Sequence, residues 1–344
     1  MKISEYVSKY DPENQFNVLI KTYEQIEFAW NNKFDLSSLK NKKFNSVIVS
    51  GLGGSAISAD LMQNFLRSEM KLPFFVNRNY FLPSFADENT LVVISSYSGN
   101  TEETVEVFNS ALAKGCKIFC ITTGGKVEKI AAQKNVPMIK VLPGFQPRYS
   151  LGLSFFSLLK AFQEIGLISD QSKFVNQIID LWKNKGNEYS QENNSAIKLA
   201  EELVGFIPSI YSATDLTSAV GYRFKCQFNE NSKLHAFHNV IPELNHNEII
   251  GWESFAEKQF HTKLITILDD DYPTQIKKRF EITSELASKN GAEVIKLKSN
   301  EKEYKLRLMD LIYLGDWITY YTAVLRGFNP TEIENINILK QRLG

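Results

Sequence analysis

The sequence contains little cysteine, no excess of charge of either sign and no long hydrophobic run. Its three cysteines, Cys116, Cys120 and Cys226, are too few for a disulfide framework, which agrees with a reducing compartment. The 39 Lys and Arg residues balance the 39 Asp and Glu residues, whereas proteins that bind nucleic acid or anionic membranes carry an excess of basic side chains. No apolar stretch is as long as a membrane-spanning helix, which needs about 20 residues, and the first residues show no signal peptide. We therefore expect a cytoplasmic protein whose partners are neither nucleic acids nor membranes.

Short apolar runs alternate with helical stretches in the first half of the 344-residue chain. Such alternation is typical of βαβ units, in which helices cover the faces of a parallel sheet. Strands are expected at 45–49, 72–76, 90–94, 117–122 and 137–141, with helices among them that include 127–133 and 149–165.

The second half repeats this order less clearly. The polar segment 183–194 is interpreted as a linker, and a long segment before residue 264 as irregular. The residues before Asn45 are expected to hold one amphipathic helix. We therefore predict an α/β protein with two doubly wound domains, 1–165 and 166–344, of related order. Further strands are expected at 206–211, 264–268 and 293–297. Helices are expected at 197–204, in a stretch that ends at 224, at 276–287, at 304–325 and in a tail that ends at 343.

A glycine turn, Gly51-Leu52-Gly53-Gly54-Ser55-Ala56, joins the first strand to a helix. Glycines allow the backbone to approach an anion, and the helix N-terminus supplies free N–H groups. The turn also fits the G-x-G-x-x-A form of a dinucleotide site, which requires an acidic residue about 20 positions later. Asn77 and Arg78 stand there instead. An NADP-binding dehydrogenase and a turn without any ligand therefore remain alternatives.

A second loop, Ser96-Tyr97-Ser98-Gly99-Asn100-Thr101, follows a buried strand and precedes a helix that begins with Glu102 and Glu103. One hydroxyl is enough to cap a helix, and the two glutamates complement its dipole. The surplus of hydroxyls suits a phosphomonoester, whose oxygens accept several hydrogen bonds at one point. Both loops leave the carboxyl ends of parallel strands, which is where open α/β sheets bind ligands.

These motifs resemble those of the sugar-isomerase (SIS) domain. Three further segments are similar to the bifunctional glucose-6-phosphate/mannose-6-phosphate isomerase family, and the likeness runs from about residue 40 to the end of the chain. They are Gln146-Pro147-Arg148-Tyr149-Ser150, Phe228-Asn229-Glu230-Asn231-Ser232-Lys233 and Pro242-Glu243-Leu244-Asn245-His246-Asn247-Glu248. The resemblance implies two SIS-type domains in each subunit, a homodimer with its active sites at the subunit interface, and no metal or other cofactor. The second domain departs from the pattern at residues 211–214, so only the first is expected to hold phosphate.

The resemblance also implies an aldose–ketose isomerase that interconverts glucose 6-phosphate, mannose 6-phosphate or both with fructose 6-phosphate. Arginine remains charged and can stabilise an enediolate, whereas histidine titrates near neutral pH. Glu230 is then the base, His246 opens the sugar ring, Arg148 lies beside the enediolate and Lys340 assists ring opening. Glu243 and Glu248 are alternative bases. The substrate phosphate is expected to be bound by Gly53, Gly54, Ser55, Ser96, Ser98 and Thr101.

All four histidines lie between positions 235 and 261, a stretch that also holds Glu243, Glu248 and Glu253. Imidazoles and carboxylates are zinc ligands, and His235 and His238 are three residues apart, so a metal site is an alternative. No His-x-x-x-His motif or cysteine pair completes the set, and we expect His246 to carry protons. A non-catalytic phosphosugar sensor is the other alternative function. Sensors of this kind carry a helix-turn-helix, for which the residues before Asn45 offer no basic patch.

Overall fold

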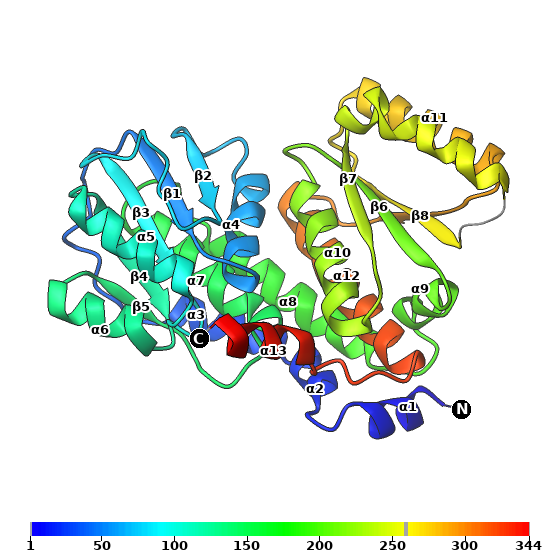
Figure 1. Cartoon of the computed structure of the whole chain (residues 1–344), viewed down its shortest axis with the longest axis horizontal. Helices are drawn as coiled ribbons and strands as arrows, with labels where there is room; N and C mark the ends of the chain where they lie inside the picture. The colour runs from blue at the N-terminus through cyan, green and yellow to red at the C-terminus, as the bar shows by residue number, and fades with distance from the viewer. Residues whose placement is uncertain (1, 258–260, 344) are drawn as a thin grey trace. The chain divides into compact units, whose positions relative to one another are not determined.

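The computed structural model describes residues 2–257 and 261–343, and its contacts divide the chain into two compact units. The first unit described here spans residues 22–180 and is called the phosphate unit, after the phosphate that the sequence predicts it to bind. The second, called the glutamate unit, combines the residues up to 21 with those from 181 onward. The domain limits expected from the sequence, 1–165 and 166–344, stay a prediction. Figure 1 shows the elements of both units.

The phosphate unit contains a five-stranded sheet of order β2-β1-β3-β4-β5 in which every pair of neighbouring strands is parallel. All residues of the central strands β1 and β3 are buried, as is typical of sheets covered on both faces. The strands are β1 (Ser46–Ser50), β2 (Phe74–Asn77), β3 (Thr90–Ser95), β4 (Lys117–Thr122) and β5 (Met138–Lys140), and the helices are α3 (Thr22–Asn31), α4 (Gly54–Phe65), α5 (Glu102–Ala113), α6 (Gly125–Lys134), η1 (Pro147–Tyr149) and α7 (Leu151–Glu164).

The glutamate unit contains a parallel four-stranded sheet of order β7-β6-β8-β9. This order repeats that of the first four strands of the other sheet, so the related order expected from the sequence is confirmed. The strands are β6 (Ile207–Ala213), β7 (Phe237–Ile241), β8 (Thr262–Leu268) and β9 (Glu293–Lys298). The other elements are α1 (Ile3–Tyr10), α2 (Gln15–Ile20), α9 (Ser195–Leu203), α10 (Ser218–Ser232), η2 (Glu243–His246), η3 (Glu248–Glu257), α11 (Thr274–Lys289), α12 (Tyr304–Leu325) and α13 (Glu334–Leu343).

Three expectations about local structure were wrong. Much of the predicted linker 183–194 is helical, because α8 (Ser172–Tyr189) buries a stripe of apolar side chains at Val175, Ile178 and Trp182 and leaves its polar face outside. The segment expected to be irregular contains β7. This strand lies at the edge of its sheet, and His238 and Asn239 interrupt its apolar residues, so no continuous apolar run marks it. The residues before Asn45 form α1, α2 and α3 rather than one helix.

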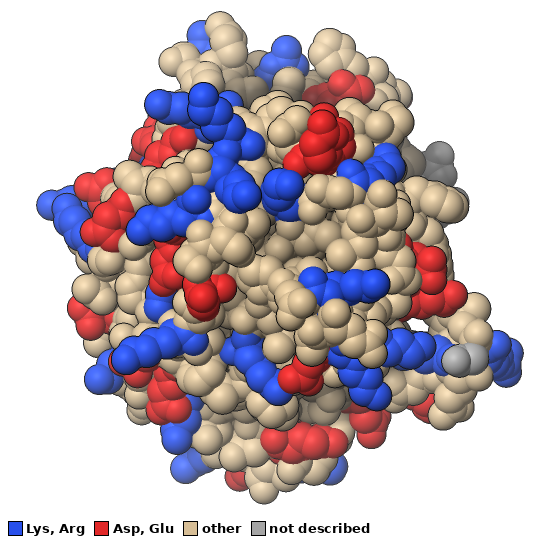
Figure 2. All heavy atoms as spheres, turned by 90° about the vertical axis from the view of Figure 1, so that its left-hand side faces the viewer, with Lys and Arg blue, Asp and Glu red and all other residues tan. Residues whose placement is uncertain are grey.

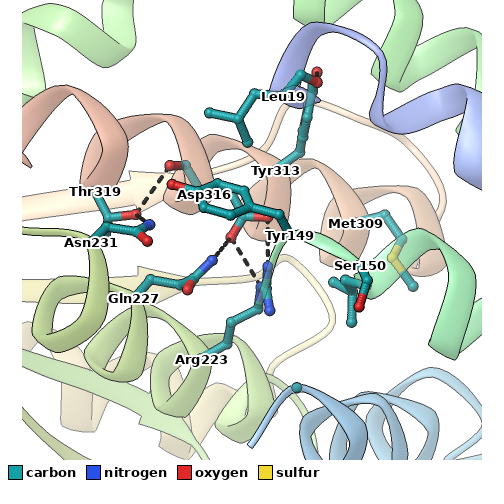
Figure 3. Close-up of polar contacts among 12 residues, drawn as sticks. Leu19, Tyr149, Ser150, Arg223, Gln227, Asn231, Met309, Tyr313, Asp316 and Thr319 are labelled. Carbon is teal, nitrogen blue, oxygen red and sulfur yellow. Dashed lines mark hydrogen bonds and ion pairs between the residues drawn. The ribbon is translucent and has the colours of Figure 1, made fainter. Parts of the chain in front are cut away.

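A buried ion pair joins α10 to α12 in the glutamate unit, as Figure 3 shows. Arg223 donates to Asp316 through Nε at 3.0 Å and Nη2 at 2.8 Å, and the two residues are 4% and 5% exposed. Gln227 donates to the same carboxylate at 2.9 Å. One turn later, Asn231 donates to the hydroxyl of Thr319 at 3.1 Å. These contacts hold the C-terminal half of α10, which carries Glu230, against a buried helix.

We expect Asp316→Ala to lower the free energy of unfolding of the glutamate unit by about 3–5 kcal/mol, because Arg223 would remain charged and buried without its partner. Urea unfolding followed by tryptophan fluorescence measures this loss, since Trp182 and Trp317 are both buried in this unit. The double variant Arg223→Met/Asp316→Leu is the control, because it removes both charges and should be less destabilised. Equal losses in the two variants would show that the ion pair is not the source of the effect.

Candidate functional site

The glycine turn at the start of α4 lies directly against the segment that carries Arg148. A Cβ atom on Gly54 would stand 2.5 Å from the carbonyl oxygen of Pro147 and 3.4 Å from the backbone nitrogen of Arg148. Only glycine permits this approach. The contact therefore places the Pro147–Arg148 peptide beside the N-terminus of α4, at the carboxyl edge of the first sheet.

The hydroxyl loop follows β3 at the same edge of the sheet. Ser96 accepts a hydrogen bond from the N–H of Gly99 at 3.1 Å, Ser55 accepts from the N–H of Tyr97 at 3.2 Å, and Ser98 accepts from the N–H of Asn100 at 3.3 Å. A serine hydroxyl that accepts from the backbone still has its own hydrogen to donate. The structure thus joins Ser55 to the loop and orients several hydroxyls as donors.

Thr101 occupies the N-cap position of α5, yet its side chain makes no capping hydrogen bond. Its hydroxyl lies 3.1 Å from that of Ser96 instead. Ser96 is buried, Thr101 is half-buried and Ser98 is exposed. The hydroxyls of this loop are therefore not accounted for by helix capping, in agreement with the surplus noted in the sequence.

The turn between β4 and α6 supports this loop, and the sequence analysis did not identify it. Gly99 has a φ of +67°, and a Cβ atom there would stand 1.8 Å from the carbonyl oxygen of Gly124. The first turn of α6 donates from Val127 to the carbonyl of Gly99 at 3.0 Å and from Lys126 to the side chain of Asn100 at 3.1 Å. The signal that could have revealed it is the run Thr122-Thr123-Gly124-Gly125 at the end of a strand.

Arg148 lies in the short helix η1 and is only 4% exposed. Its guanidinium carbon is 5.3 Å from the ring centroid of Tyr149. The turn is closed by hydrogen bonds from the N–H of Tyr149 to the carbonyl of Gln146 at 2.8 Å and from the hydroxyl of Ser150 to the carbonyl of Pro147, also at 2.8 Å. The phosphate unit therefore brings together Arg148 and the six residues expected to bind phosphate.

Glu230 lies in the last turn of α10 and is half-buried. Its neighbours have structural roles: Asn231 and Ser232 bond to Thr319 of α12, and Asn229 accepts from the N–H of Ala236 at 3.2 Å. Lys233 adopts a left-handed conformation and ends the helix. Most of this motif thus positions the helix end on which Glu230 is carried.

His246 is exposed and lies at the end of η2, directly after β7. Its neighbour Asn245 anchors this turn by donating to the hydroxyl of Thr283 at 2.8 Å. Because α10 runs antiparallel to the strands, its C-terminus lies where β7 begins, whereas η2 lies beyond the point where β7 ends. A five-residue strand is about 16 Å long. Within one glutamate unit, Glu230 therefore lies near the amino ends of the strands and His246 near their carboxyl ends. The two residues are not brought together.

The alternative bases differ in their surroundings. Glu243 is exposed. Glu248 is half-buried and accepts hydrogen bonds from the hydroxyl of Tyr211 at 2.7 Å and from the amide of Asn239 at 2.5 Å. Burial, together with the bond to Glu248, raises the pKa of Tyr211, so this phenol stays protonated and donates. The carboxylate of Glu248 is thus already engaged in a buried polar network.

The other histidines do not gather around His246. His238 contacts the hydroxyl of Ser212 through Nε2 at 2.7 Å, and burial together with the charge of Lys225 lowers the pKa of His238 to about 4. His235 and His261 are exposed. Over residues 2–257 and 261–343, no group of three or more His, Cys, Asp or Glu side chains is arranged to hold a metal ion.

The second sheet presents no counterpart of the phosphate loops among the residues that the structure describes. The hydroxyl of Thr217, at the start of α10, accepts from the N–H of Ala213 at 3.1 Å and is bonded to the hydroxyl of Tyr272. The loop after β8 carries Asp269, which is paired with Arg307 at 2.7 and 2.9 Å. A tyrosine and carboxylates thus stand where the first sheet presents hydroxyls.

Two further positions complete the sites expected from the sequence. Lys340 lies on α13, whose residues up to 343 are exposed. Arg78, on which an NADP site would depend, pairs with Asp60 of α4.

Among the helices that the structure describes, none is long and apolar enough to cross a membrane. On the face seen in Figure 2, Lys and Arg are interspersed with Asp and Glu, in keeping with the balanced charge of the chain.

Comparison with known proteins identifies both units. Residues 38–162 match the model of the SIS domain, and residues 192–343 match that of the bacterial phospho-glucose isomerase C-terminal SIS domain. The chain also resembles the crystal structure of a hypothetical protein from Thermus thermophilus, with a TM-score of 0.74, 16% identity, and coverage of 99% of this chain and 94% of the other. At this identity the likeness shows the fold.

Two curated relatives are similar over nearly their whole lengths. A bifunctional phosphoglucose/phosphomannose isomerase of Caldicellulosiruptor bescii is 38% identical over 325 residues, which cover 93% of this chain and 96% of the relative. One of Aquifex aeolicus is 32% identical over 332 residues, 94% of this chain and 98% of the relative. The resemblance drawn from the motifs is thus confirmed, and the chain belongs to the family of bifunctional phosphoglucose/phosphomannose isomerases.

Proposed function

We propose that this protein interconverts glucose 6-phosphate and mannose 6-phosphate with fructose 6-phosphate through a cis-enediolate, without a metal. The observation that carries the proposal is the placement of Arg148 beside the glycine turn and hydroxyl loop in one unit. An anion site next to a buried arginine suits a substrate that carries a phosphate at one end and develops negative charge at the other. The dehydrogenase alternative is weakened because Arg78 is engaged by Asp60.

The phosphate is bound by Ser55, Ser96, Ser98 and Thr101 together with the backbone at Gly53 and Gly54. Hydroxyls and N–H groups at two helix N-termini, those of α4 and α5, are directed to one edge of the sheet. The phosphate then determines which sugar carbons reach the catalytic groups.

The isomerisation divides among three side chains. His246 transfers protons between the ring oxygen and the anomeric hydroxyl, which opens the ring. Glu230 removes the proton from C2 of the open aldose; the electron pair of that C–H bond forms a C1–C2 double bond, and the carbonyl pair moves onto the C1 oxygen. The hydroxyl proton of the C2 oxygen then passes to the C1 oxygen. The electron pair left on the C2 oxygen forms the C2 carbonyl, and the double-bond pair takes the proton from Glu230 at C1. Arg148 stabilises the enediolate oxygens between the two proton transfers. Lys340 assists ring opening.

The positions of two of these groups in the glutamate unit support a homodimer. Glu230 and His246 of one chain lie at opposite edges of the same sheet. One active site can contain both groups if a second copy of the chain supplies the histidine. The exposure of His246 at the end of η2 supports this arrangement.

We expect the double variant Ser96→Ala/Thr101→Ala to raise KM for fructose 6-phosphate by at least about 30-fold, because two donors to a charged phosphate are lost. Steady-state kinetics measure the change. The matched control is Ser46→Ala/Thr90→Val, which removes a similar hydroxyl pair, 3.3 Å apart, at the opposite edge of the same sheet. A normal KM in the first variant would contradict the assignment.

Glu230→Gln should lower kcat by about 10²- to 10⁴-fold, because it removes the proton acceptor and keeps the shape of the side chain. Exchange of the C2 proton of glucose 6-phosphate with solvent, followed by NMR, should disappear with it. Glu201→Gln is the control, since Glu201 is an exposed residue of α9 with no proposed role. Near-normal exchange in Glu230→Gln would move the base to Glu243 or Glu248.

Mixing two inactive variants tests the shared active site. Glu230→Gln and His246→Ala, refolded together in equal amounts, should recover about a quarter of wild-type activity, because half of the dimers are mixed and one of their two sites combines an intact Glu230 with an intact His246. Sedimentation verifies that dimers form. Co-refolding that leaves the mixture as inactive as its components would contradict a site built from two chains.

A further inference from the structure

The side chain of Tyr97 connects the hydroxyl loop to the segment that leads to Arg148. Its hydroxyl donates to the carbonyl of Leu142 at 2.9 Å and accepts from the N–H of Phe145 at 3.0 Å. Burial raises the pKa of this phenol, so it is protonated at neutral pH and able to donate. One side chain therefore holds both ends of the stretch 142–145.

The backbone of Tyr97 is itself firmly held. Its N–H donates to the hydroxyl of Ser55 at 3.2 Å, and its carbonyl accepts from Thr123, through N–H at 3.0 Å and through the hydroxyl at 2.7 Å. These partners belong to the first turn of α4 and to the turn between β4 and α6. The phenol thus extends from a point fixed by both turns that support the phosphate site.

The stretch that Tyr97 holds has little support of its own. Residues 142–144 are exposed, and Gly144 has a φ of +97° with no atom near its Cβ position. Arg148 follows Phe145 by three residues, within the closed turn at Gln146–Ser150. That turn meets Gly54 on one side, and Tyr97 restrains the chain that enters it.

We propose that Tyr97 is a positioning residue of the isomerase reaction, which fixes Arg148 relative to the bound phosphate through the carbonyl of Leu142 and the N–H of Phe145. The inference rests on the proposed function, because it assumes that Arg148 stabilises the enediolate. Catalytic groups must be held closely to be effective, and a misplacement of about 1 Å costs up to about 10²-fold in rate. The phenol acts through the backbone and touches no reacting atom.

The test is Tyr97→Phe, which removes the hydroxyl and keeps the ring. We expect kcat to fall by about 10- to 100-fold while KM for fructose 6-phosphate stays within about two-fold, because the phosphate hydroxyls are untouched. Two inhibitors distinguish a loss of enediolate binding from a loss of phosphate binding. Binding of 5-phospho-arabinonohydroxamate, which resembles the enediolate, should weaken by the same factor as kcat, whereas binding of sorbitol 6-phosphate, which carries the phosphate without an enediolate-like group, should not change.

The matched control is Thr90→Val, which removes a hydroxyl that accepts from the N–H of Asp87 at 3.1 Å at the far edge of the same sheet. It should lose stability without a change in kcat. A Tyr97→Phe variant with normal kcat, or one in which both inhibitors weaken together with a rise in KM, overturns the inference and leaves the proposed function standing. A wild-type protein that does not isomerise fructose 6-phosphate overturns the proposed function and the inference together.

Discussion

Parallel strand pairing is the constraint on which the rest of the structure depends. When all strands of a sheet point the same way, every turn that follows a strand lies at one edge. In the phosphate unit β1 and β3 are neighbours, with Ser50 opposite Ile94, so the glycine turn and the hydroxyl loop that follow them must lie side by side. The helices that begin there add their N–H groups to the same edge. The gathering of helix N–H groups at this edge is thus a consequence of topology before any side chain is considered.

The two sheets share this topology, but their carboxyl edges carry different side chains. Both sheets have the order that brings the first and third strands together, and both have helices that begin at their carboxyl edges. In the second sheet Thr217 and Tyr272 close the turn, and Asp269 and Arg307 neutralise each other nearby. The first edge presents glycines and serine hydroxyls, whereas the second presents a tyrosine and a paired carboxylate. The second unit carries Glu230 at the end of α10 and His246 in the turn after β7.

Buried polar contacts determine where the end of α10 lies. Arg223, Gln227 and Asp316 bind α10 to α12 over its middle, and Asn231 and Thr319 do so at its end. A helix held along two turns cannot rotate its last turn freely, so the position of Glu230 depends on these contacts between α10 and α12. Such a network is stable only when every member is paired, which makes its loss costly.

The sequence by itself determined the elements with strong periodicity and the loops with unusual composition. The strand 117–122, the helix 304–325 and the hydroxyl surplus at residues 96–101 were all recognisable, because each is a local pattern of residue types. It did not reveal the edge strand β7, whose apolar residues are interrupted by His238 and Asn239, or the Gly124–Gly125 turn. Only the tertiary structure decided that Arg148 lies against Gly54 and that Glu230 and His246 lie at opposite edges of one sheet. Those relations join residues far apart in the chain, and they arise from packing and strand direction, which no local pattern records.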